Sequence, residues 1–246
     1  MKQIISPHID DAFLSLGGSI LNWIEKKEKI KIIHVFSKSN WTNPNSLSAK
    51  KYTKDIETIS NIKKREEEEV SSILKTKPVF LDYIEKIPLY NMEQKDIIKK
   101  VKKSFNKEFV KNIENSLTME INKRFICFFP LSTEDHPSHR LVNDIGLNLL
   151  KKGYNIQFYE DFPYISRNIN KIKEITSFRN FKLIPILKEI NIKRKLKILK
   201  CYKSQISVRW LDEMETYAHS LKENKYYERY WKPIKRNHLF FHNKYI

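Results

Sequence analysis

Two short segments of the sequence gather side chains that bind metal ions and move protons. The first holds His8, Asp10 and Asp11, directly after an apolar run, and the second holds His136 and His139, directly after another. Histidine and carboxylate ligands that leave one position open form the catalytic zinc arrangement. One aspartate can bind the metal while its neighbour serves as general base. In the same way, one histidine of the second segment can be a ligand while the other faces the substrate.

The elements around these segments follow an alternating pattern. Periodicity predicts strands at residues 2–7, 30–36, 78–84, 124–131 and 154–162, and helices at 12–27, 62–75, 93–115 and 139–152. Several of the strands are apolar on both faces, which is typical of a parallel sheet wrapped by helices. We therefore predict an α/β fold with a Rossmann-like, mostly parallel sheet. Ligands of such sheets bind beyond the carboxyl ends of the strands, where strand order reverses, so both segments should meet over one crevice.

The length favours a single domain. We expect it to fill residues 1–246, with a core over about 1–165 and a C-terminal extension over about 166–246. The extension is largely helical in pattern and rich in lysine and tyrosine. The polar stretch 37–60 is expected to form a long loop, and long loops in compact domains are often functional lids.

The chain is strongly basic, with 47 Lys and Arg against 29 Asp and Glu and a formal charge of +18. A nucleic acid or an anionic surface would fit this charge, and residues 225–236 combine basic and aromatic side chains. However, a nucleic-acid footprint should cluster on one face, and the lysines here are spread over most predicted helices. We expect no nucleic-acid partner, and we interpret residues 225–236 as a packed helix with snorkelling lysines.

The compartment follows from what the sequence lacks. No apolar run approaches the roughly 20 residues that span a bilayer, and the N-terminus has no signal-peptide core or cleavage site. Cys127 and Cys201 lie far apart, and Cys127 sits in an apolar run where a free thiol is expected. We therefore expect a cytoplasmic protein without a membrane span.

Each site residue also has an ordinary structural interpretation. Asp10 and Asp11 could cap the helix that follows them, and Asp135 or His136 could cap the next one. His34, His219, His238 and His242 lack such neighbours and are interpreted as ordinary core or surface histidines. The position of both clusters at strand ends favours a site over caps.

A different enzyme class shares this ligand chemistry. Two histidines and a carboxylate also form the triad of non-haem iron oxygenases, and His8-x-Asp10 has their spacing. Those enzymes resemble an all-β double-stranded helix in fold, so the alternating strands and helices of this sequence argue against that class.

The motifs resemble those of a known family. PHIDDAFLSLGG at residues 7–18 resembles the opening motif of the PIG-L / LmbE-like zinc-dependent de-N-acetylases, and HPSHR at 136–140 resembles their second motif, His-x-x-His. Weaker similarities at 158–164, 202–205 and 228–231 extend the resemblance over nearly the whole chain. The resemblance implies a hydrolase that removes an N-acyl group, typically N-acetyl, from a small amino sugar or sugar conjugate. It implies Zn²⁺, or another divalent metal such as Fe²⁺.

The same resemblance implies a role for each site residue. The implied zinc ligands are His8, Asp11 and His139. Asp10 is the implied base that activates the zinc-bound water, and His136 is implied to stabilise the oxyanion and to protonate the leaving amine. Arg65 and Glu85 are the implied substrate contacts.

One departure from the family pattern concerns His136. The family often carries Asp before the last histidine of the second motif, where this chain has Ser138. A carboxylate near His136 would favour its charged form. We expect Asp135 or Asp161 to replace it, and we favour Asp161 because it follows a neighbouring strand.

Overall fold

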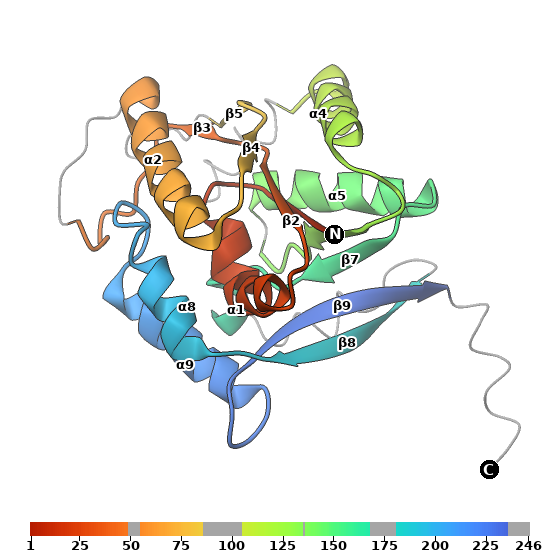
Figure 1. Ribbon diagram of the computed structural model, residues 1–246. Coiled ribbons are helices and arrows are strands. Elements are labelled where there is room, and N and C mark those ends of the chain that lie inside the picture. The colour runs from red at the N-terminus through yellow and green to blue at the C-terminus, as the bar shows by residue number, and fades with distance from the viewer. Residues whose placement is uncertain (49–54, 86–104, 135, 168–180, 236–246) are drawn as a thin grey trace, which may run out of the picture.

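The structure is a computed structural model that describes residues 1–48, 55–85, 105–134, 136–167 and 181–235. Its centre is a seven-stranded sheet of order β4-β2-β1-β6-β7-β9-β8 (Figure 1). The first five strands in this order pair in parallel. They are β4 (Pro78–Phe80), β2 (Ile30–His34), β1 (Lys2–Ser6), β6 (Ile126–Pro130) and β7 (Ile156–Tyr159). The predicted α/β fold with a mostly parallel sheet is confirmed.

Helices connect and cover these strands. In chain order they are α1 (Asp11–Glu25), α2 (Ile56–Leu74), α4 (Lys107–Glu120), α5 (Pro137–Lys151), the short α6 (Tyr164–Arg167), α8 (Ile192–Leu199) and α9 (Val208–Ser220). Each lies within or close to a stretch expected to be helical, although part of the helix predicted at 93–115 falls outside the described residues. None of the described helices is long and apolar enough to cross a membrane.

Adjacent phenylalanines of β6 show that the sheet is covered on both faces. Phe128 packs on Trp23 of α1, with ring centroids 5.0 Å apart. Phe129 lies against α5, where a Cβ on Gly146 would sit 2.7 Å from its ring. Successive side chains of a strand point to opposite faces, so α1 and α5 lie on opposite sides of β6. Burial on both faces explains why this strand reads as one continuous apolar run.

Strand order reverses at β1, as the pattern predicts. β1 pairs with β2 on one side and with β6 on the other. The chain therefore moves outward in one direction after β1 and in the opposite direction after β6. The segments that follow these two strands meet at the same edge of the sheet.

The strand predicted at 78–84 is interrupted. Asp82 adopts a left-handed conformation with φ of 58°, and the chain leaves the main sheet after β4. Residues beyond this turn form β5 (Ile84–Glu85), which pairs in parallel with β3 (Lys38–Ser39) in a separate two-stranded sheet. The predicted loop at 37–60 thus contains a strand, and α2 starts within it.

The C-terminal extension contains strands that the pattern did not predict. β8 (Phe181–Glu189) and β9 (Tyr227–Lys235) form an antiparallel pair, and β9 joins β7 through Trp231 and Tyr230. Pro185 and Pro233 obscured both strands in the sequence, because proline is tolerated only where a strand needs no donor on that side. The interpretation of residues 225–236 as a packed helix was therefore wrong.

Candidate metal centre and active site

The first segment turns sharply from β1 into α1. The Ser6 hydroxyl donates to the carbonyl of His8 and accepts from the N–H of Ala12 at 3.0 Å. The backbone N–H of His8 donates to Asp11 Oδ2 at 2.8 Å. Asp10 occupies the N-cap position of α1, yet its side chain makes no capping bond within the described structure. The capping interpretation of Asp10 is thus wrong, and its carboxylate is left for another role.

Three donor atoms from the two segments converge. His8 Nδ1 lies 3.0 Å from Asp11 Oδ2, His139 Nε2 lies 3.2 Å from the same oxygen, and the two ring nitrogens are 3.3 Å apart. Tetrahedral ligands about 2.1 Å from a zinc ion are separated by about 3.4 Å. All three side chains are buried. The donor set therefore fits a divalent metal ion in chemistry and spacing.

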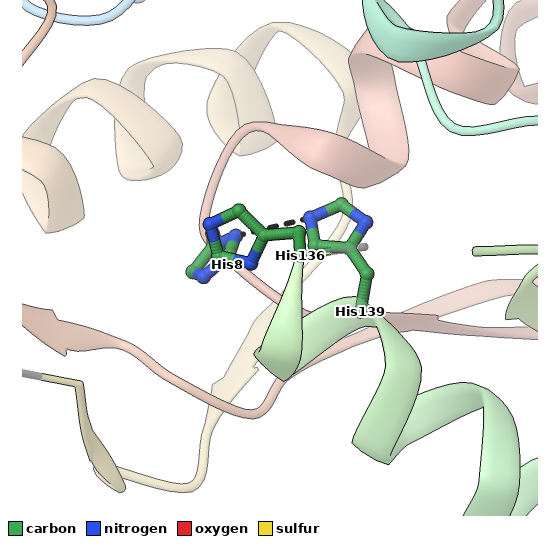
Figure 2. Close-up of side chains that lie close together, drawn as sticks. All are labelled: His8, His136 and His139. Carbon is green, nitrogen blue, oxygen red and sulfur yellow. Dashed lines mark hydrogen bonds between the residues drawn. The ribbon is translucent and has the colours of Figure 1, made fainter. Parts of the chain in front are cut away.

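His136 gives a second possible ligand set. The rings of His8, His136 and His139 each offer a nitrogen within 4.8 Å of the others (Figure 2). His136 stands at the N-cap of α5, and its ring centroid is 5.1 Å from that of each other histidine. Its Nδ1 is buried without a hydrogen-bond partner among the described residues. The set with Asp11 is the tighter of the two and matches the tetrahedral spacing better.

Each of the two converging histidines has a carboxylate at its far nitrogen. Glu85 Oε2 lies 2.8 Å from His8 Nε2, and Asp161 Oδ1 lies 2.7 Å from His139 Nδ1. Such partners fix the tautomer and orientation of metal-binding histidines. Glu85 is 2% exposed and also accepts from the hydroxyl of Ser138. It is enclosed between protein groups, so its position does not match the expected substrate contact.

Asp161 also shapes the second segment. Its Oδ2 accepts from the backbone N–H groups of Ser132 at 2.6 Å and Thr133 at 3.2 Å. Ser132 has a left-handed φ of 59°, which these bonds help to hold. The predicted pairing of Asp161 with His136 is therefore wrong, because both of its oxygens are used elsewhere. Asp135, the other candidate partner, lies outside the described residues.

The charges of the cluster shift its titration. Burial alone would lower the pKa of His8, but Glu85 and Asp11 outweigh it and raise that pKa to about 9. Burial lowers the pKa of His136 to about 3, against the opposing charge of Glu85. The expected cationic His136 is thus not supported, because no carboxylate among the described residues bonds to it directly. Burial and the neighbouring Asp11 raise the pKa of Asp10.

The structure does not bring Arg65 to the cluster. Arg65 is exposed on α2, whereas Lys63, Glu66 and Glu67 are buried on the helix face that packs inward. At about 100° per residue, Arg65 points about 200° away from Lys63. Lys63 acts electrostatically on Asp10, since its charge, like that of His8, lowers the pKa of that carboxyl. The spacing of buried positions on α2 could have identified it.

An aromatic residue at the site also escaped the sequence analysis. Tyr164, the first residue of α6, packs edge-on against His139 with ring centroids 5.4 Å apart. Its ring lies 6.1 Å from that of His136. Burial, followed by the charges of Asp11 and other nearby carboxylates, raises the pKa of its hydroxyl. Its position in the sequence, just after the strand that follows the second segment, could have identified Tyr164 as a site residue.

One curated protein with similarity to this chain is the 2'-N-acetylparomamine deacetylase of Niallia circulans. The two are 25% identical over 185 residues, which is 66% of each. The match thus spans just under two thirds of that relative.

Solved structures share the fold. Teicoplanin deacetylase in a zinc-inhibited form aligns with a TM-score of 0.68 and 17% identity, over 95% of this chain and 98% of that one. N,N'-diacetylchitobiose deacetylase from Pyrococcus horikoshii aligns with a TM-score of 0.62 and 18% identity, over 95% and 83%.

The family model of the GlcNAc-PI de-N-acetylases, PIG-L, matches residues 3–150. This match contains both site segments and more than half of the chain. The protein therefore belongs to the PIG-L family of de-N-acetylases.

Proposed function

We propose that this protein is a metal-dependent hydrolase that removes an N-acyl group, typically acetyl, from an amino sugar or sugar conjugate. The observation that carries the proposal is the convergence of His8 Nδ1, Asp11 Oδ2 and His139 Nε2 within 3.3 Å of one another. Family membership supports the amide hydrolysis. The names of similar proteins, deacetylases of acetylparomamine and of diacetylchitobiose, support an amino-sugar substrate.

Zinc is the metal that we propose for His8, Asp11 and His139. A zinc ion held there would polarise the acyl carbonyl and lower the pKa of water. Glu85 and Asp161 accept a hydrogen bond from the far ring nitrogen of each histidine and so orient it, while the nitrogen that faces the metal must lose its proton to serve as a ligand. Two nitrogen ligands and one carboxylate, with a fourth position open, match the catalytic zinc sites of hydrolases.

Asp10 is the base in this proposal. It is 6% exposed, it makes no capping bond to the described part of α1, and its pKa is raised. A carboxylate with a raised pKa accepts a proton from the attacking water more readily than an ordinary aspartate. It can then pass this proton to the departing amine as the C–N bond breaks. The positive charge of Lys63 lowers the pKa of Asp10 and so partly opposes burial and Asp11, which raise it.

His136 is assigned to the oxyanion. Burial keeps its imidazole neutral, and a neutral imidazole still has one N–H to donate. A donor that is already in place where negative charge develops stabilises the transition state. The structure therefore favours Asp10 over His136 as the source of the proton for the amine.

The two alternative functions are less well supported. Non-haem iron oxygenases with this triad resemble an all-β fold, whereas this sheet is mostly parallel and covered by helices. A nucleic-acid surface over residues 225–236 would need exposed aromatic rings. Tyr226 and Tyr227 are half-buried, and Tyr230 and Trp231 are each 5% exposed, so the last two are not available for stacking on bases.

An amine-release screen tests the proposed function. The purified protein is incubated with N-acetylated amino sugars, nucleotide sugars and sugar conjugates, with and without added zinc. We expect release of a free amine from at least one class, stimulated by zinc at low ratios to protein. His139→Ala should lose both the metal and the activity. Full metal retention in that variant would contradict the ligand assignment, and amine release without metal would contradict the mechanism.

The proposed location is the cytoplasm. Cys127 and Cys201 are both free thiols in the structure, which suits a reducing compartment.

A further inference from the structure

A strand of the C-terminal extension reaches into the middle of α1. Glu228 of β9 accepts a hydrogen bond from the N–H of Gly18 at 2.8 Å and another from the N–H of Ser19 at 2.7 Å. Its side chain is buried. These amides lie about two helical turns from Asp11, in the helix whose start carries Asp10 and Asp11. A carboxylate from residue 228 is therefore bonded to the helix that begins at the proposed metal centre.

Lys195 of α8 completes this contact. Its Nζ lies 2.8 Å from Glu228 Oε1 and donates to the carbonyl of Leu14 at 2.7 Å. In a regular helix the carbonyl of residue 14 is the acceptor for the N–H of residue 18. The ion pair therefore binds both partners of one backbone hydrogen bond of a regular α1. Lys195 binds the carbonyl of Leu14, and Glu228 binds the N–H of Gly18.

The glycine pair of the first motif makes room for this approach. A Cβ on Gly18 would lie 2.5 Å from Ile190, and a Cβ on Gly17 would lie 3.2 Å from Lys195 Cγ. Glycine within a helix is less stable than alanine. The two glycines thus weaken α1 locally, at the point where Glu228 and Lys195 hold it.

Stability alone does not account for the ion pair. Lys195 is 2% exposed and Glu228 is 5% exposed. The desolvation of two buried charges offsets most of their attraction, and apolar residues of similar volume are often as stable or more so. The ion pair instead contributes to positioning, because its hydrogen bonds hold the backbone of α1 at a defined place.

We propose that Glu228 is a positioning residue for the metal centre. By holding the backbone at Gly18 and Ser19, it fixes how the first turn of α1 presents Asp11 to the metal. Glu228 and Lys195 both lie outside residues 3–150, the part matched by the family model. The C-terminal extension is then part of the catalytic unit. This inference rests on the proposed metal centre.

Two double variants separate positioning from stability. Lys195→Met with Glu228→Gln removes both charges but keeps one acceptor oxygen, in place of the two that receive the N–H groups of Gly18 and Ser19. Lys195→Met with Glu228→Leu removes both charges and the acceptor. Neither variant leaves an unpaired buried charge, so both should fold. Zinc dissociation constants are measured by competition with a chromophoric chelator, well below the melting temperature of each apo-protein.

We expect the leucine variant to bind zinc about 10-fold more weakly than the glutamine variant, the low end of effects known for outer-shell residues. The zinc dissociation constant of the glutamine variant should stay within about threefold of that of the unmodified protein. Lys232→Gln, at an exposed position of the same strand, is the control and should change nothing.

Equal zinc affinity in the two double variants would overturn the positioning role while leaving the metal centre intact. If the leucine variant does not fold, the glutamine variant still decides, because a folded glutamine variant with 10-fold weaker binding would overturn the inference. Absence of zinc binding by the unmodified protein would overturn the proposed metal centre itself.

Discussion

The two segments that form the site are held in different ways. The segment after β1 is shaped largely by its own residues, since Ser6 and Asp11 bond the backbone within a few positions. The segment after β6 depends on a distant carboxylate, because Asp161 bonds two of its amides and also His139. Local bonds fix the first half of the site, and a neighbouring strand end fixes the second. Damage to the supports should therefore affect the two halves unequally.

The largest effect is expected at the first segment, where Asp10 is the proposed base. Asp10→Asn should lower kcat by about 10²–10⁴, the usual contribution of a positioned base. Zinc content should not change, since Asp10 is outside the tightest donor set. Metal analysis and steady-state kinetics of the same preparation measure both. Near-native turnover in Asp10→Asn would show that Asp10 is not the base.

The supporting carboxylates give the direct comparison of the two halves. Asp161→Asn should weaken zinc binding about 10- to 100-fold, as expected for an outer-shell partner of a metal-binding histidine. Glu85→Gln should fall at the lower end of that range, because His8 is also held through Asp11, whereas Asp161 additionally binds the N–H groups of Ser132 and Thr133. Competition with a chelator measures the zinc affinity of both variants and shows which of them loses more. A larger loss in Glu85→Gln would reverse the comparison.

Acidity should weaken zinc binding at both proposed histidine ligands, since the pKa of His139 is also raised, by Asp11 and Asp161 against the effect of burial. The pKa of His8 is raised above its ordinary value, to about 9, so below pH 9 a proton must leave before its nitrogen can bind metal. The affinity should therefore rise with pH up to about 9, by about 10-fold per pH unit for each proton displaced. Zinc titrations between pH 6 and 8 measure this slope. A flat profile would show that Glu85 and Asp11 do not keep His8 protonated in the metal-free protein.

The smallest effect is expected at Arg65. Arg65→Met should change kcat/KM by less than about twofold, since exposed positions away from a site are usually near neutral. Lys63→Met, on the buried face of the same helix, should lower kcat because it removes the charge that acts on Asp10. Comparing the two variants on one substrate tests which face of α2 serves the site. A greater loss in Arg65→Met would restore the substrate contact expected from the sequence.

The hydrophobic pattern predicts the parallel core and places two polar segments at its carboxyl edge. Doubly buried strands read as apolar runs, and parallel strands end at one edge, so the segments around His8 and His139 could be placed near one another from the sequence, while the choice of His8, Asp11 and His139 as ligands came from the family resemblance. The placement of the two segments rests on periodicity and strand order, which are properties of the chain itself.

The pairing of each carboxylate with its histidine emerges only in the folded chain. Asp161 bonds to His139 rather than His136, and Glu85 turns toward His8 because the chain leaves the sheet at Asp82. Such pairings depend on shifts of a few ångströms in turns, and no sequence period encodes them. The bond from Glu228 to α1 joins residues 210 positions apart, and it exists only because β9 folds back onto the sheet.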